Sequence, residues 1–150
     1  MHFATDAQRD CYERVLPWLE EIFGEHLVVS EEGPEFGVMV GSAFAQTAIH
    51  PFEENEALVC TRAYVVKGVE LSYALYDYLL RENHEVLFGG FGVNPSGDVF
   101  FQHAILGSTC DKPELEASVM AVASLADRYD DEIMLRWGGE RAIDEARRHR

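Results

Sequence analysis

Residues 26–66 constrain the fold most, because they hold four short apolar stretches with turn sequences between them and no stretch long enough for a helix. The stretches are HLVVS, EFGVMVGSA, FAQTAIHPF and ALVCTRAYVV, and the breaks between them are EEGP, GS and EENE. Short runs rich in β-branched and aromatic residues, bounded by such breaks, are typical of strands. Strands joined by short turns pair antiparallel. We therefore expect three antiparallel strands here, with room for a short leading one.

Three other segments have the apolar spacing of amphipathic helices. They cover residues 5–23, residues 69–84 and the long stretch that begins after residue 111. Their expected ends are marked by capping residues and glycines: Thr5 or Asp6, Gly24, Asn83, Asp111, and Gly138 with Gly139. The resulting order is helix, three strands, helix, two strands, helix. Strands grouped in this way predict an α+β single domain, a twisted antiparallel sheet flanked by helices.

The sequence GGFGVNPSGDVFF, residues 89–101, has two glycines at the spacing of a nucleotide-binding P-loop, Gly92 and Gly97. A P-loop needs Lys and then Ser or Thr after the second glycine, whereas Asp98 and Val99 stand there. The alternative is a turn that begins at Asn94, between two strands. We expect a β-hairpin in which Gly97 has a positive φ and Asp98 is a single exposed charge, so that Asp98→Lys is nearly neutral for folding.

The formal charge is −15, and it is unevenly distributed. Residues 1–135 hold seven basic and 24 acidic residues, whereas the last fifteen residues hold five basic and three acidic ones. A surface this negative repels nucleic acid and anionic lipid, so we expect no nucleic acid and no membrane among the partners. Two explanations of the negative charge stay open: it keeps the protein soluble and does nothing more, or its electrostatic field attracts basic peptide segments.

The N-terminal sequence and the cysteines indicate a cytoplasmic protein. The start, MHFATDAQRD, has no basic region followed by an apolar one. Three widely spaced cysteines, Cys11, Cys60 and Cys110, suit buried reduced thiols. By length the chain is one domain, which we place at residues 1–139, with residues 140–150 as a charged tail that is helical or frayed.

The sequence contains no strong catalytic or metal-binding pattern. None of the six histidines pairs with another ligand at a recognised metal spacing, and no nucleophile has the flanking pattern of a hydrolase. We therefore expect no catalytic residue, no metal and no cofactor. The alternative is a small hydrolase that uses carboxylates, or His50 and His103 if these two lie close together in a cleft.

Two segments are candidates for partner binding. In DVFFQHAIL, residues 98–106, strand alternation places Phe101 and His103 on one face and Phe100 on the other, so both faces carry large apolar groups. In ADRYDDEIMLRWGGERA, residues 126–142, Trp137 and Arg136 lie at a helix end, where they either complete the core and pair with acids or anchor a partner. We take these five residues as the expected partner-binding set.

The chain resembles the YbjN-like proteins, which share the fold of the type III secretion chaperones. The likeness runs from about residue 6 to residue 139 and includes the order of the elements, ENHEVLFGGFGVNPSGDVFFQHAIL and ADRYDDEIMLRWGG. The positions that carry it are Asn83, the strand from Phe88 to Gly92, Gly97 before Asp98, the A-D-x-Y-D set Ala126, Asp127, Tyr129 and Asp130, and the pair Gly138 and Gly139.

This resemblance implies a non-enzymatic, chaperone-like domain that binds a protein or peptide client, or regulates a partner by binding it. It brings no catalytic residues. Secretion chaperones are homodimers that wrap an extended client, so the resemblance also implies a homodimer, which the adjacent Phe100 and Phe101 of one strand favour as well. Besides the small hydrolase, a structural dimer subunit of a larger regulator stays open as an alternative. An open antiparallel sheet suits peptide binding, because an extended peptide can pair with its edge.

Overall fold

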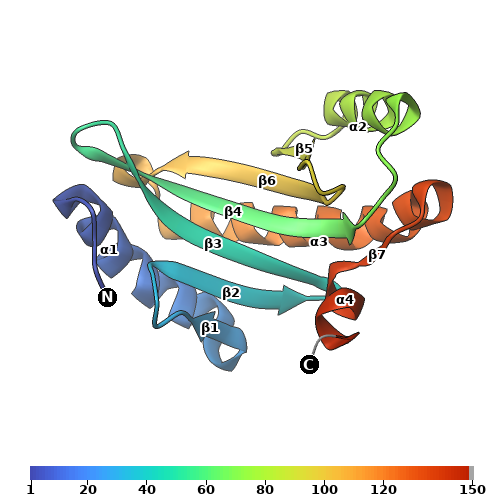
Figure 1. Cartoon of the computed structure of the whole chain (residues 1–150). Coiled ribbons are helices and arrows are strands. Elements are labelled where there is room, and N and C mark those ends of the chain that lie inside the picture. The colour runs from blue at the N-terminus through green and yellow to red at the C-terminus, as the bar shows by residue number, and fades with distance from the viewer. Residues whose placement is uncertain (149–150) are drawn as a thin grey trace.

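The computed structural model describes residues 1–148, which form four α-helices and seven β-strands (Figure 1). The elements are α1 (Asp6–Phe23), a 3-10 turn (Gly24–His26), β1 (Leu27–Val29), β2 (Glu35–Val40), β3 (Ala43–Phe52), β4 (Glu56–Lys67), α2 (Tyr73–Glu85), β5 (Gly90–Val93), β6 (Val99–Leu106), a second 3-10 turn (Gly107–Thr109), α3 (Lys112–Trp137), β7 (Glu140–Arg141) and α4 (Ala142–Arg148). Within the described part, no helix is long and apolar enough to cross a membrane.

The strands form one antiparallel sheet in the order β1-β2-β3-β4-β6-β5, and β7 pairs with the end of β4. The predicted α+β fold and element order are therefore confirmed. β1 is the short leading strand for which the sequence left room. β4 has one unpaired residue between Tyr64 and Val66, a β-bulge at which the register with β6 shifts. Such bulges increase local twist.

The helix ends lie at or close to the capping signals. The Thr5 side chain accepts a hydrogen bond from the Gln8 N–H at the start of α1, and Asp111 accepts one from the Glu114 N–H at the start of α3. Gly138 ends α3 with φ 74°. These local interactions satisfy backbone groups that a helix end leaves unpaired.

Helices α1 and α3 lie on one side of the sheet, behind it in Figure 1. Alternate residues of β3 point toward them and are buried, among them Ala45 and Ile49. They pack with apolar side chains from both helices, including Val15, Leu19, Leu115, Val119, Val122 and Ile133. We call the opposite side of the sheet the open face, because α4 is the only helix of residues 1–148 that lies against it.

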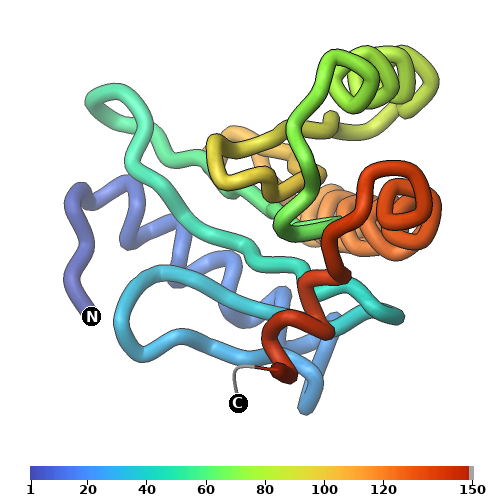
Figure 2. The backbone as a smooth tube through the Cα atoms, turned by 45° about the vertical axis from the view of Figure 1, so that its right-hand side comes forward, coloured from blue at the N-terminus to red at the C-terminus, as the bar shows by residue number. Residues whose placement is uncertain are grey.

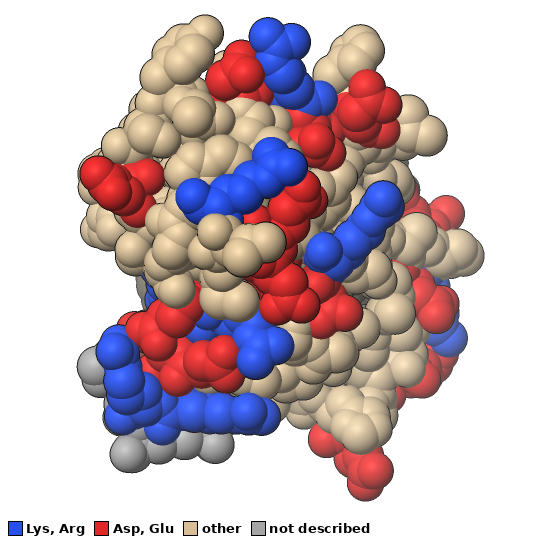
Figure 3. All heavy atoms as spheres, turned by 90° about the vertical axis from the view of Figure 1, so that its right-hand side faces the viewer, with Lys and Arg blue, Asp and Glu red and all other residues tan. Residues whose placement is uncertain are grey.

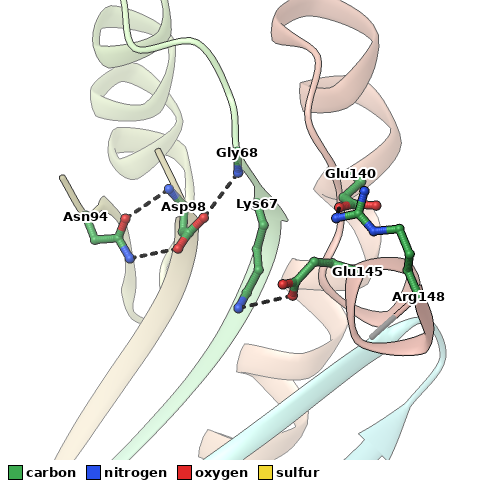
Figure 4. A network of polar contacts seen from close by, with 7 residues as sticks. All are labelled: Lys67, Gly68, Asn94, Asp98, Glu140, Glu145 and Arg148. Carbon is green, nitrogen blue, oxygen red and sulfur yellow. Dashed lines mark hydrogen bonds and ion pairs between the residues drawn. The ribbon is translucent and has the colours of Figure 1, made fainter. Parts of the chain in front are cut away.

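The predicted hairpin of β5 and β6 is confirmed, and its turn runs from Asn94 to Gly97. The Asn94 side-chain oxygen accepts hydrogen bonds from the N–H groups of Ser96 and Asp98, and Gly97 has φ 82° as expected. The expectation that Asp98 is a single exposed charge was wrong. Its carboxylate accepts hydrogen bonds from the Gly68 N–H at 3.1 Å and from the Asn94 amide at 3.0 Å, so it joins two segments rather than standing alone in solvent (Figure 4).

Residues 140–148, which the sequence placed in a charged tail, fold back onto the sheet. β7 pairs with β4, and the helix α4 follows against the open face. Figure 2 shows this C-terminal segment beside β2 and β3, far from the N-terminal end of α3. The segment therefore covers part of the open face of the sheet.

Candidate functional site

A row of large apolar side chains crosses the open face, one from each of four neighbouring strands. We call it the aromatic row, and it consists of Met39 in β2, Phe44 in β3, Tyr64 in β4 and Phe100 in β6. The strand register pairs Met39 with Phe44 and Tyr64 with Phe100. The rings of Tyr64 and Phe100 meet edge to face, with their centroids 6.0 Å apart. Phe44 is 42% exposed and Met39 is 41% exposed, so much of the row faces solvent.

Two glycines let the rings of this row lie flat against the sheet. A Cβ atom at Gly37 would overlap the ring of Phe44, and one at Gly92 would overlap the ring of Phe100. Both glycines therefore act through the space that they leave for a ring on the neighbouring strand. Because the two rings lie over the glycines, the apolar surface of the row is flat and the side chains do not protrude from the sheet.

Two cations accompany the row. The Arg62 guanidinium lies 4.0 Å from the centre of the Phe100 ring and donates a 2.6 Å hydrogen bond to the Gln102 side chain. The Lys67 ammonium lies 4.8 Å from the centre of the Tyr64 ring and pairs with Glu145 of α4. Cations over aromatic faces are favourably placed by the ring quadrupole. The open face therefore combines apolar surface with two positioned cations, of which Lys67 is paired with an acid, within a chain that is acidic overall.

A cavity of about 470 Å³ lies between the aromatic row and α4. Its walls are formed by Met39, Phe44, Tyr64 and Lys67 from the sheet and by α4 residues that include Ile143. The volume lies in the range of small-ligand and side-chain pockets. One end of the open face is thus covered loosely, and the other end is uncovered.

The structure separates the predicted strand residues. Phe100 lies on the open face in the aromatic row, whereas Phe101 is 0% exposed and belongs to the core. His103 points toward α3, where its Nδ1 lies 2.8 Å from the Ser118 hydroxyl, and its ring packs on Phe88. Burial lowers the pKa of His103. Neither Phe101 nor His103 is therefore on the surface that Phe100 offers to a partner.

The predicted helix-end residues lie elsewhere, where α2 meets the end of α3. The Trp137 ring packs against Tyr78 with centroids 4.9 Å apart, and Arg136 pairs with Glu132 at 3.1 Å. The Arg136 guanidinium also lies 5.0 Å from the Tyr78 ring. These contacts match the structural alternative, in which Trp137 completes the core and Arg136 pairs with an acid. A role for either in partner binding stays a prediction.

The histidine pair suggested for a hydrolase does not form. His50 lies on the open face, whereas His103 faces α3 on the other side of the sheet. Two groups on opposite faces of one sheet cannot share a cleft. Within residues 1–148 there is also no cluster of three or more His, Cys, Asp or Glu side chains arranged to hold a metal.

One cluster of polar side chains does converge, at the turn between β2 and β3. The Ser42 hydroxyl contacts the carboxylates of Asp127 and Asp130, and the Ser42 N–H donates to Asp127 at 2.9 Å. Burial raises the pKa of Asp130, while hydrogen bonds from Ser42 lower the pKa of Asp127. These acids belong to the A-D-x-Y-D motif, so the motif fixes the β2–β3 turn onto α3.

Asn83, another residue of the resemblance, holds the edge strand β5. Its side-chain oxygen accepts a 2.6 Å hydrogen bond from the Phe91 N–H, and its amide donates to the Phe91 carbonyl. These backbone groups face away from β6, as the outer groups of an edge strand do. Asn83 therefore occupies the edge of β5 at the position where an added strand would pair.

The outer side of α2 carries exposed apolar side chains, although its inner side is buried through Leu75 and Leu79. Tyr73 is 83% exposed and Leu80 is 70% exposed. Tyr76 lies between them on the same side of the helix, with the spacing of successive turns. This is a second apolar surface, separate from the open face.

The residues of the open face could have been found only partly from the sequence. Alternation within EFGVMV places Phe36 and Val38 on one face and Met39 on the other. Applied to all strands, the same rule selects Phe44 and Tyr64. No sequence pattern places α4 over them, because that contact depends on how the chain returns after α3.

Three comparisons relate this geometry to known proteins. A family model described as "T3SS (YopN, CesT) and YbjN peptide-binding chaperone 1", TY-Chap1, matches residues 10–145. Among curated proteins, no sequence matches the chain. A chain of the ExsC–ExsE complex superposes with a TM-score of 0.61 at 18% identity, covering 85% of this chain and 96% of the other.

A chain from the structure titled the HopA1–SchA chaperone–effector complex superposes with a TM-score of 0.61 at 11% identity, covering 85% of this chain and 98% of the other. At these identities the two superpositions establish the fold. The family model spans nearly the whole sequence, from α1 to α4. The chain therefore belongs to the TY-Chap1 family, the T3SS and YbjN peptide-binding chaperones.

Proposed function

We propose that this protein is a non-enzymatic chaperone-like domain that binds a protein or peptide client on the open face of its sheet. The aromatic row is the observation that carries the proposal. Exposed, contiguous apolar surface on a soluble domain is typical of an interaction site. Tyr64 and Phe100 are rigid anchors of the kind that dominate binding energy. Membership of a peptide-binding chaperone family supports the same conclusion.

A protein client also agrees with the structural neighbours, one of which is titled a chaperone–effector complex. We further propose that the protein acts in the cytoplasm and that client binding regulates the client. None of the three cysteines forms a disulfide, and burial raises the pKa of each thiol, to about 12 for Cys110. Thiols with raised pKa values are poor nucleophiles, which favours a structural role for them.

Binding rather than catalysis is supported by how the ionisable groups are used. Ser42, Asp127 and Asp130 hold a turn against α3. His103 is engaged with Ser118, and Arg62 with Gln102. These groups stabilise the fold instead of converging on a cleft, whereas a hydrolase needs a nucleophile, a base and an oxyanion site around one reacting atom.

We also propose a homodimer, in which the outer side of α2 is the surface that a second copy covers. Tyr73, Tyr76 and Leu80 form its apolar stripe. Light scattering over a range of concentrations tests this: we expect twice 16.9 kDa at high micromolar concentration. A mass that stays at 16.9 kDa contradicts the proposed dimer. Tyr73→Ser with Leu80→Ser should return the protein to a folded monomer with the circular dichroism spectrum of the wild type, because both side chains are exposed in the single chain.

Client binding is tested by selecting peptides from a random library displayed on phage, with the full-length chain as bait. A selected peptide is then synthesised, and its Kd is measured by fluorescence anisotropy. Phe44→Ser should weaken binding at least tenfold, because it removes an anchor of the aromatic row. The matched control is Leu135→Ser, which removes an exposed apolar side chain from α3 and should change Kd less than twofold. Selection of no peptide, or equal loss in both variants, contradicts the proposal.

A further inference from the structure

The C-terminal segment crosses from the covered side of the sheet to the open face. After α3, Gly138 and Gly139 have φ values of 74° and 79°, and β7 pairs with Val66 and Lys67 at the end of β4. A Cβ atom at Gly139 would lie 2.6 Å from the Lys67 carbonyl oxygen, so the chain passes very close to the end of the strand. These two glycines allow the tight turn that delivers α4 onto the open face.

An ion pair holds α4 there. The Lys67 ammonium lies 3.4 Å from the Glu145 carboxylate, and the two side chains are 31% and 28% exposed (Figure 4). Elsewhere in the segment, Arg148 pairs with Glu140 of β7 at 2.6 Å. Figure 3 shows acidic and basic side chains interleaved over this end of the molecule, with no large patch of one sign. Lys67 thus offers a defined position for a carboxylate beside the aromatic row.

The fit of α4 to the sheet is loose. A helix of seven residues is too short to be stable by itself, so α4 depends on the sheet for its structure. Ile143 is its only large apolar side chain, and a cavity of about 470 Å³ remains between α4 and the aromatic row. Unfilled space beside apolar side chains loses dispersion contacts that a larger side chain would restore.

We propose that this end of the open face is the site for a short amphipathic helical segment of the client, with a bulky apolar side chain that fills the cavity and a carboxylate that pairs with Lys67. In the absence of a client, α4 occupies this site as an intramolecular competitor, and the client segment displaces it. The inference rests on the proposed client binding and specifies its chemistry. Because α4 is covalently attached, its effective concentration at the site is high. Its binding there lowers the apparent affinity of the protein for a client.

The test uses ¹⁵N-labelled full-length protein with Ile143→Asp, which removes the apolar contact of α4 and leaves the core unchanged. The probes are capped peptides of residues 138–148: the native sequence, one with Ile143→Trp and one with Glu145→Lys. The native peptide should move the amide signals of Phe44, Tyr64 and Lys67 toward their wild-type positions. Wild-type protein should show no shifts at the same millimolar concentrations.

The peptide variants test the two chemical requirements separately. The Trp peptide should bind at least fivefold more tightly than the native peptide, because it fills the cavity. The Lys peptide should bind at least fivefold more weakly, and adding Lys67→Glu to the labelled protein should restore it. Equal affinities for the three peptides, equal shifts in wild-type and Ile143→Asp protein, or no shifts at all overturn the inference.

The phage-selected peptide separates this inference from the proposed function. It should bind Ile143→Asp protein at least threefold more tightly than wild type. If it binds both equally, client binding stands and the competition by α4 is contradicted. If no peptide can be selected while the three α4 peptides behave as expected, client binding is contradicted and the site beside Lys67 stands.

Discussion

Gly97→Ala tests how the hairpin is held against the rest of the domain. Gly97 has φ 82°, and a Cβ atom there would lie 2.5 Å from the Val69 carbonyl oxygen. The two residues are also joined by a 2.9 Å hydrogen bond from the Val69 N–H to the Gly97 carbonyl, so the backbones cannot separate freely. A side chain at this position meets both an unfavourable backbone conformation and a backbone atom.

Two other glycines provide matched controls. Gly68 has φ 70° with nothing within 4 Å of a built Cβ, and Gly33 has neither a positive φ nor a close neighbour. A left-handed conformation costs an L-residue about 1–2 kcal/mol, and crowding of a packed site adds about 1–3 kcal/mol. We therefore expect a loss of about 1–2 kcal/mol for Gly68→Ala and about 2–5 kcal/mol for Gly97→Ala. Gly33→Ala should raise the free energy of unfolding by up to about 1 kcal/mol, because it restricts the unfolded chain without strain in the folded one.

The assay is urea unfolding followed by circular dichroism, with the free energy of unfolding obtained by linear extrapolation. All three substitutions reduce the entropy of the unfolded chain similarly, so the differences between them report the folded state. The close contact with Val69 predicts that Gly97→Ala is less stable than Gly68→Ala by about 1–3 kcal/mol. Equal losses for these two variants would refute the role assigned to that contact.

Three further substitutions test individual contacts. Asp98→Lys should lower the free energy of unfolding by about 1–2 kcal/mol, whereas Asp98→Asn, which keeps an acceptor for the Gly68 N–H, should lose less than half of that in the same urea assay. Asn83→Ala should cost about 1–3 kcal/mol because the Phe91 N–H loses its acceptor; unchanged exchange of that amide with deuterium would contradict this. Burial raises the pKa of Asp130, so its protonated form is favoured in the folded state, and the stability that it contributes below about pH 4 is lost as pH rises through its folded pKa. Asp130→Asn should therefore become more stable relative to wild type between pH 4 and pH 7, and a difference independent of pH would exclude this explanation.

Local chemistry made much of the fold predictable. The turn residues Asn94 and Gly97 define the β5–β6 hairpin, and the caps Thr5 and Asp111 begin their helices as the sequence indicates. Nothing in the sequence indicated that Asp98 is more than a single exposed charge, because its hydrogen-bond partner, the Gly68 N–H, is distant in sequence. Such a contact has no periodic pattern by which to recognise it.

The candidate site was predictable in part. Alternation along β6 correctly separated Phe100 from Phe101, yet it could not say which face the helices cover. That choice depends on the packing of α1 and α3 against one side of the sheet, the side on which Phe101 is buried. The position of α4 depends on the path of the chain after Gly139, so neither the cavity nor the Lys67–Glu145 pair was accessible from the sequence.

The most direct test of client binding on the open face is photo-crosslinking of the phage-selected peptide to full-length protein. p-Benzoylphenylalanine replaces Phe44 in one sample and Leu135, which is exposed on α3, in the other. Binding on the open face predicts a crosslinked product with the probe at residue 44 and none at residue 135. A product at residue 135 with none at residue 44 would contradict it.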